Sequence, residues 1–71
     1  MEKLEFNLDG SDYIELIKLL KVMGLCESGG QAKQVVEEGL VQVNQEQESR
    51  KRRKCRSGDI VEFEESQITV I

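Results

Sequence analysis

Apolar and polar residues alternate over positions 4–8, which predicts a half-buried strand near the start of the chain. Turn-forming residues follow, and Ser11 or Asp12 can cap a first helix. Apolar residues at helical spacing over positions 14–23 give this helix a buried face, and Gly24 is suited to end it. The first third of the chain therefore predicts a strand, a turn and a helix.

A second helix is expected almost at once. Ser28 and Gln31 have the S-x-x-Q spacing of a capping box, in which the two side chains satisfy free backbone N–H groups. An apolar stripe over positions 32–36 provides the buried face, and Gly39 marks the end. A helix of about ten residues is too short to be stable alone, so we expect it to pack on its neighbours.

Period-two patterns return after the second helix. Positions 41–44 predict a strand that ends in a turn, and positions 60–63 and 67–71 predict a hairpin that follows a turn at 57–59. These elements predict an α+β fold, with two short helices packed on a small, mainly antiparallel sheet. We expect the 71 residues to form one domain and a monomer, with a free sheet edge at the last strand.

The charge of the chain is unevenly distributed. The formal net charge is −4, yet residues 50–56 contain six basic residues and no acid. Residues 1–49, by contrast, contain four Lys or Arg and ten Asp or Glu. Local potential rather than net charge decides where an anion docks, so residues 50–56, hereafter the basic segment, predict a contact for backbone phosphates. A solvated edge strand protected from aggregation is the alternative, although one or two charges would suffice for that role.

The sequence leaves the conformation of the basic segment open. In a regular strand, one face would carry Arg50, Arg52, Lys54 and Arg56, and the other would carry Lys51, Arg53 and an inward-pointing Cys55. An irregular loop is the alternative, because Lys51 and Arg53 would otherwise have to reach around a sheet edge. No counter-ion lies within the segment, so an anionic partner or solvent is expected to screen its charges.

The start of the second helix offers a further anion site. Gly29 and Gly30 leave its backbone N–H groups open to a phosphate, and Lys33 adds a positive charge nearby. Simple capping flexibility is the plainer explanation for the two glycines. With one Tyr and two Phe the chain lacks the stacking platform of single-strand binders, and Tyr13 is expected to pack on a face of the first helix rather than to stack on a base. This favours recognition of backbone and shape in folded RNA over reading of splayed bases.

The composition argues against catalysis and against metal binding. The chain has no histidine and only two cysteines, so neither a mixed Cys–His zinc site nor a four-thiolate site can form. A domain this small has little room for a water-excluding catalytic pocket, and no nucleophile motif appears. We therefore expect no enzyme, no cofactor, no metal and no small-molecule substrate. Cys26 and Cys55 are expected to act as small apolar residues, although the cations around Cys55 leave a thiol switch open.

The sequence also bears on location. No run of about 18 apolar residues could span a bilayer. Residues 1–5 are rich in charge and lack the apolar stretch of a signal peptide. We therefore expect a cytoplasmic protein with no membrane contact.

The order of the elements resembles the S4-like RNA-binding domain over positions 13–63. The residues that carry this resemblance are the leucine-rich positions 16–20, Gly24, Ser28, Ala32, Gly39, the V-x-V-N strand at 41–44 and the Gly58-Asp59 turn. Positions 28–33 and 48–52 are similar to small stand-alone bacterial S4-like proteins of the YbcJ type. The resemblance implies an S4-like fold with an αL motif, which binds RNA through the face of the second helix and the adjoining strand and loop.

Eleven residues are candidates for RNA contact by charge and by position in the resemblance: Ser28, Gly29, Gly30, Gln31, Lys33, Arg50, Lys51, Arg52, Arg53, Lys54 and Arg56. Two departures from the family pattern stand out. Gly29 replaces an Arg that many S4-like domains carry, and Asn44-Gln45 replaces a common Asn-Gly. The first departure leaves more of the electrostatic task to the basic segment, where Arg50 and Arg52 are the leading candidates.

The sequence thus predicts a non-catalytic module that docks structured RNA, ribosomal or transfer RNA, through its backbone phosphates. The alternative is a protein-interaction module whose basic strand binds an acidic partner. RNase treatment of captured partners separates the two hypotheses, because a protein partner would survive the digestion.

Overall fold

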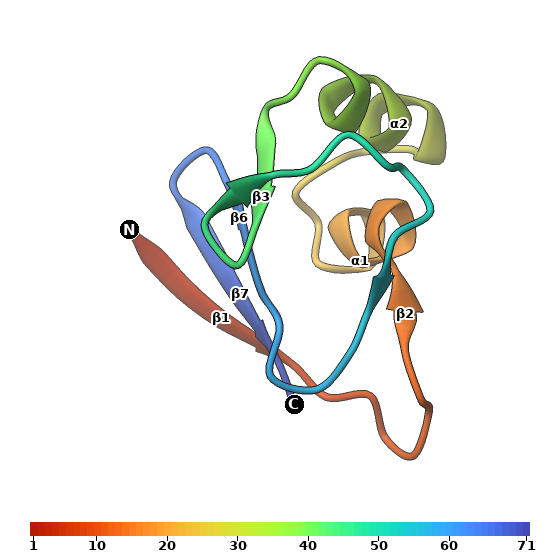
Figure 1. The fold of residues 1–71 in the computed structure, drawn as a ribbon, viewed down its shortest axis with the longest axis vertical. Helices are drawn as coiled ribbons and strands as arrows, with labels where there is room; N and C mark the ends of the chain where they lie inside the picture. The colour runs from red at the N-terminus through yellow and green to blue at the C-terminus, as the bar shows by residue number, and fades with distance from the viewer.

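The computed structural model describes residues 1–71 and contains seven strands and two helices. In chain order they are β1 (Glu2–Phe6), β2 (Ile14–Glu15), α1 (Leu16–Val22), α2 (Gly29–Glu37), β3 (Val41–Val43), β4 (Glu46–Gln47), β5 (Lys54–Cys55), β6 (Ile60–Phe63) and β7 (Ser66–Val70). A five-stranded sheet has the order β1-β7-β6-β3-β4, and β2 and β5 form a separate two-stranded ribbon. Figure 1 shows both helices on one side of the larger sheet, with the ribbon below α1.

The expected α+β fold with a mainly antiparallel sheet is confirmed. The pairs β3–β4, β3–β6 and β6–β7 are antiparallel, and only β1 pairs in parallel, with β7. The expectation of a free edge at the last strand was wrong, because β7 lies between β1 and β6. The first strand also lies two residues earlier than expected, since its register pairs Glu2 with Ser66 and Phe6 with Val70. The free edges of the sheet are therefore β1 and β4.

The core lies between the helices and one face of the sheet. Fourteen buried apolar residues form a single cluster, to which alternate positions of β3, β6 and β7 contribute. Leu16, Leu19 and Leu20 of α1 and Ala32 and Val36 of α2 are fully buried against them. The period-two and helical apolar patterns therefore meet in one core, as amphipathic elements require. Neither helix has the length and apolar character needed to cross a membrane.

The first helix begins later than the sequence predicted. α1 starts at Leu16, and its N-cap residue Glu15 provides no side-chain cap, so the expected caps Ser11 and Asp12 were wrong. The residues just before α1 are instead extended, because β2 pairs with β5. The free N–H groups of Leu16 and Ile17 donate to carbonyl groups of the basic segment, at N–O distances of 2.8 and 3.3 Å. A tertiary contact thus takes the place of a local cap.

The second helix begins as expected. The Ser28 Oγ accepts a hydrogen bond from the Gln31 N–H at 3.1 Å, which confirms Ser28 as the N-cap. The Gln31 side chain accepts from the N–H of Glu27 at 2.6 Å, one residue earlier than a capping box predicts. At the other end Gly39 adopts a φ of 75°, and its missing side chain leaves room for the Gln47 amide, which donates to the Gly39 carbonyl at 2.9 Å. These bonds fix both ends of α2.

A two-residue turn joins β3 to β4. Val43 pairs with Glu46, and the turn residues Asn44 and Gln45 have φ angles of 53° and 70°. Positive φ at both central residues defines a type I′ turn, which Asn-Gly fits best because a side chain strains the second position. The departure from Asn-Gly therefore leaves conformational strain at Gln45.

Replacing Gln45 with glycine should raise the free energy of unfolding by about 0.5–1 kcal/mol, because relief of the left-handed strain exceeds the entropy gained by the unfolded chain. Urea unfolding measures the change. Gln42→Gly in the middle of β3 is the matched control and should lower stability by about 0.5–1 kcal/mol. Equal destabilisation by both substitutions would contradict the assignment of strain to the turn.

Candidate nucleic-acid interface

The basic segment is a turn followed by a short strand, which settles the question that the sequence left open. The Arg53 N–H donates to the Arg50 carbonyl at 3.2 Å and closes the turn. Lys54 and Cys55 then form β5, and the Cys55 side chain points inward as expected and is fully buried. Because Lys51 and Arg53 also cap α1 through their carbonyls, the backbone of the segment is fixed to the helix.

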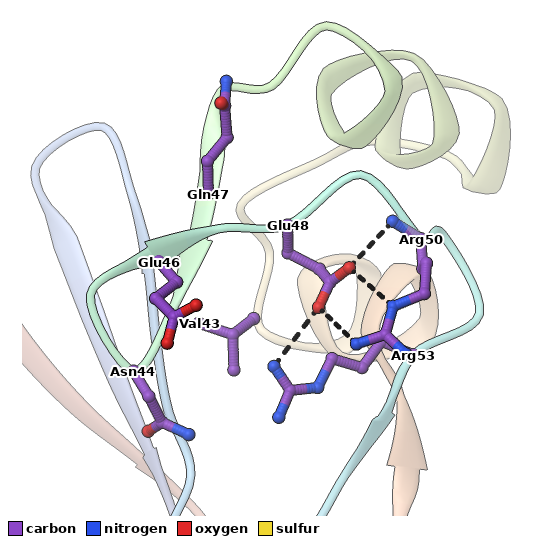
Figure 2. A pocket seen from close by; sticks show the side chains of 7 residues that line it. All are labelled: Val43, Asn44, Glu46, Gln47, Glu48, Arg50 and Arg53. Carbon is purple, nitrogen blue, oxygen red and sulfur yellow. Dashed lines mark hydrogen bonds and ion pairs between the residues drawn. The ribbon is translucent and has the colours of Figure 1, made fainter.

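A buried carboxylate holds the segment from within. The Glu48 side chain is 9% exposed and accepts hydrogen bonds from the backbone N–H, Nε and Nη2 of Arg50 at 3.0, 2.9 and 3.1 Å. It also accepts one from Nη1 of Arg53 at 3.2 Å, so two guanidinium groups converge on one carboxylate (Figure 2). The hydrogen bond from the Arg50 side chain lowers the pKa of Glu48 to about 2, against the opposing effect of burial. Glu48 is therefore ionised at neutral pH.

A second anchor joins the two turns that the family pattern singles out. The Asp59 carboxylate accepts from the Asn44 amide at 3.1 Å and from the Arg56 N–H at 2.8 Å, and it lies 3.9 Å from Nη2 of Arg53. The Asn44 side-chain oxygen in turn accepts from the Ile60 N–H at 3.0 Å. The Asn of the V-x-V-N strand and the Asp of the Gly-Asp turn therefore act together to place the end of the basic segment.

The basic segment has counter-ions in space although it has none in sequence. Lys51 pairs with Glu37 of α2 at 3.1 Å and Arg52 pairs with Glu15 at 3.2 Å, in addition to the pairs of Arg50 and Arg53 with Glu48. The expectation that only a partner or solvent would screen these charges was therefore wrong. The exposed pairs of Lys51 and Arg52 contribute little to stability, and these two cations stay accessible to another anion.

The side chains differ in how far they reach into solvent. The side chains of Arg50 and Arg52 are 75% and 76% exposed, whereas that of Arg53 is only 23% exposed between Glu48 and Asp59. Arg50, Arg52, Arg53 and Lys54 together line an open hollow of about 530 Å³ that contains no apolar side chain. This geometry supports Arg50 and Arg52 as the leading candidates and makes Arg53 mainly an anchor.

Tyr13 is not part of the first helix, which begins at Leu16, so it does not lie on a face of that helix as expected. It precedes β2, is 39% exposed and lies beside the last cations of the basic segment. Lys54 Nζ is 4.9 Å and Arg56 Cζ is 5.6 Å from the centroid of its ring. Lys54 and Arg56 form no ion pair with a carboxylate, so their charges face the ring and the solvent.

The candidates on α2 lie in its cap and first turns, and the helix reaches the basic segment through Glu37 near its other end. Ser28 and Gln31 are engaged in capping, while an added Cβ would meet no atom at Gly29 and only the Ser28 Oγ, at 3.8 Å, at Gly30. Lys33 is one helical turn before Glu37, which binds Lys51. Helical spacing therefore places Lys33 on the face that borders the basic segment, whereas no direct contact joins the glycines to it.

Glu48 was missed as a functional candidate. Its neighbours in the sequence are polar, so no apolar pattern indicated a buried side chain there. The signal that could have found it is an acid placed two residues before a dense run of arginines, which favours a bidentate ion pair. The burial that makes this pair strong comes from the tertiary fold.

Cys55 is poorly suited to act as a thiol switch. Burial, with a smaller contribution from the Asp59 charge, raises its pKa to about 11, against the opposing effect of Arg53. Burial also raises the pKa of Cys26. Because the thiolate is the reactive form, the structure favours the plainer interpretation of both cysteines as small apolar core residues.

Comparison with known proteins identifies the class. The profile of the S4 domain family matches residues 6–71, so the chain belongs to the S4 domain family. The protein YbcJ of Escherichia coli (strain K12), named as a candidate RNA-binding protein, is 41% identical over 66 residues, which span 93% of this chain and 94% of YbcJ. The uncharacterized protein YbcJ of Shigella flexneri matches with the same identity and coverage. The resemblance seen in the sequence is thereby confirmed.

A solved structure agrees with the fold. The solution structure of YbcJ from E. coli superimposes with a TM-score of 0.73 at 40% sequence identity, covering 94% of this chain and 85% of that chain. That structure is described as revealing an αL motif involved in RNA binding. The two helices and the sheet of the present chain are thus those of an αL, S4-like fold.

Protonation of Glu48 should destabilise the fold in acid. Its folded pKa of about 2 lies below the ordinary value of 4.5, so its stabilising contribution is complete above pH 4.5 and is lost as the pH falls toward 2. Glu48→Gln should lower the free energy of unfolding by about 1–3 kcal/mol at pH 7, because it removes the negative charge and replaces one of the two acceptor oxygens with an NH2 donor. Urea unfolding between pH 2 and pH 7 measures both effects.

The exposed Glu46→Gln serves as the control and should change stability little at any pH. The stability of Glu48→Gln should depend on pH less than that of the wild type below pH 4.5, because the titrating group is gone. A wild type and a Glu48→Gln variant with the same acid dependence would contradict the role given to this carboxylate.

Proposed function

We propose that this protein is a non-catalytic module that binds structured RNA, ribosomal or transfer RNA, through its backbone phosphates. The observation that carries the proposal is the fixed cationic surface of the basic segment. Its backbone is held by α1 and by Glu48, while Arg50 and Arg52 project most of their side chains into solvent. A cation that is already positioned loses little entropy when it meets a phosphate.

The form of the surface supports phosphates over bases as the main contact. The hollow lined by Arg50, Arg52, Arg53 and Lys54 is open and contains no apolar residue, so it suits a charged ligand on the outside of a folded RNA. The names given to the E. coli relative and to its structure, which concern RNA binding, support the same ligand class. Lys33 extends the positive surface along α2.

We further propose that the protein acts as a monomer in the cytoplasm, where ribosomal and transfer RNA are abundant. The net charge of −4 would oppose long-range attraction to RNA, so binding must rely on short-range contacts within about one Debye length, roughly 8–10 Å. This favours docking on a defined RNA shape over indiscriminate coating of any polyanion.

The double variant Arg52→Gln/Lys54→Gln should weaken binding to a structured RNA and reduce the salt slope. Each lost phosphate contact removes about 0.7–0.9 from the slope of log K against log salt, so the pair should remove about 1.4–1.8. Both side chains are exposed and their loss should leave the fold intact. Fluorescence anisotropy with a labelled transfer RNA, from 50 to 300 mM salt, measures the slope.

Lys3→Gln/Lys21→Gln is the matched control, because it removes the same charge from β1 and from the end of α1. This control should keep the wild-type slope. Equal salt slopes for both double variants would mean that only net charge matters, and would overturn the proposal. Protein partners that stay bound after RNase treatment would favour the protein-interaction hypothesis. Arg53 is left unchanged, because its replacement would strip a partner from Glu48 and Asp59.

A further inference from the structure

The β2–β5 ribbon holds an aromatic ring at its outer end. Ile14 pairs with Cys55 and Glu15 with Lys54, so the residue before β2, Tyr13, lies opposite Arg56. Ile14 and Cys55 are buried, and alternation along the two strands turns their neighbours the other way. The ribbon therefore presents Tyr13, with Lys54 and Arg56 beside it, on the face turned away from the core.

These two cations differ from the rest of the basic segment. Arg50, Lys51, Arg52 and Arg53 each form an ion pair with a carboxylate, whereas Lys54 and Arg56 form none. Instead they lie 4.9 and 5.6 Å from the centroid of the Tyr13 ring. An exposed cation–π contact is weaker than the stacking of a nucleobase on an aromatic ring, so a base can replace a cation there.

Space is available beside the ring. A hollow of about 360 Å³ is lined by Tyr13, Ile14, Glu15 and Lys18. A second hollow, of about 180 Å³, is lined by Tyr13 together with Phe6 and Leu8 among others. Three residues border both hollows: Tyr13, Ile14 and Lys18. Tyr13 therefore borders open space in both hollows.

We infer that Tyr13, Lys54 and Arg56 form a stacking site for one unpaired nucleotide of the bound RNA. The base stacks on the Tyr13 ring, and the displaced ammonium and guanidinium groups bind the phosphates on either side of that nucleotide. The inference rests on the proposed function and adds to it: phosphate contacts along the basic segment hold a folded RNA, and the ribbon selects an unpaired nucleotide at the edge of a helix.

Two RNA hairpins with the same loop test this inference. One has a fully paired stem, and the other carries a single unpaired nucleotide at the open end of the stem. The wild type should bind the second hairpin about ten-fold more tightly, which is the gain in affinity expected from one base–aromatic stacking contact. Tyr13→Phe should keep this preference because the ring is retained. Tyr13→Leu, which keeps apolar bulk but lacks an aromatic face, should lose the preference and keep its affinity for the paired stem.

The ring can also be observed directly, because Tyr13 is the only tyrosine in the chain. With ¹³C-labelled tyrosine, its ring resonances should shift upfield on addition of the hairpin with the unpaired nucleotide and move little with the paired stem. Circular dichroism of each variant confirms that the fold is retained.

The outcomes separate this inference from the proposed function. If both hairpins bind the wild type equally, or if Tyr13→Leu weakens both to the same extent, the stacking site is wrong while RNA binding stands. If neither hairpin nor transfer RNA binds, the proposed function itself fails and the stacking site falls with it. Retention of the ten-fold preference in Tyr13→Leu would also overturn the inference.

Discussion

The Glu48 carboxylate and the two guanidinium groups that converge on it set the position of everything that follows in the chain up to β5. Six cations in seven residues would repel one another and leave a mobile loop if nothing held them. A buried anion with four hydrogen bonds at 2.9–3.2 Å binds Arg50 and Arg53 at the two ends of one turn. Desolvation makes such a pair costly unless it is well hydrogen-bonded, and here every acceptor position is used. The cations of the basic segment are therefore held in fixed positions.

The contacts that stabilise the fold are therefore also the contacts that position the candidate site. The turn that Glu48 holds directs two carbonyl groups at the start of α1, which has no side-chain cap of its own. The same turn leads into β5, whose pairing with β2 fixes Tyr13 at the surface. Loosening the turn should therefore disturb the first helix, the cationic surface and the aromatic ring together. This coupling explains how a domain with a core of 14 buried apolar residues can present a rigid binding surface on a loop.

Much of the fold could be predicted from the sequence, because local signals and tertiary packing agree there. Ser28 caps α2 and Gly39 ends it, and the alternating residues of β3, β6 and β7 meet in the core as their period predicts. The predictions that were wrong concern places where segments distant in the chain come into contact. The start of α1 is set by carbonyl groups about 35 residues away in the chain. The counter-ions Glu15, Glu37 and Glu48 come from β2, from α2 and from the loop after β4. For the same reason the position of Tyr13 beside β2 was missed, since a strand of two residues is too short to show a period in the sequence.

RNA affinity of Glu48→Gln tests the central claim most directly, because two accounts of the basic segment predict opposite results. If charge alone mattered, removing an anion from the protein would strengthen binding to RNA. If the segment works because Glu48 fixes it, the variant should bind several-fold more weakly, measured where both proteins are fully folded. Glu46→Gln removes the same charge from an exposed neighbouring position and should bind slightly more tightly or equally. Tighter binding by Glu48→Gln, equal to that of Glu46→Gln, would contradict the account.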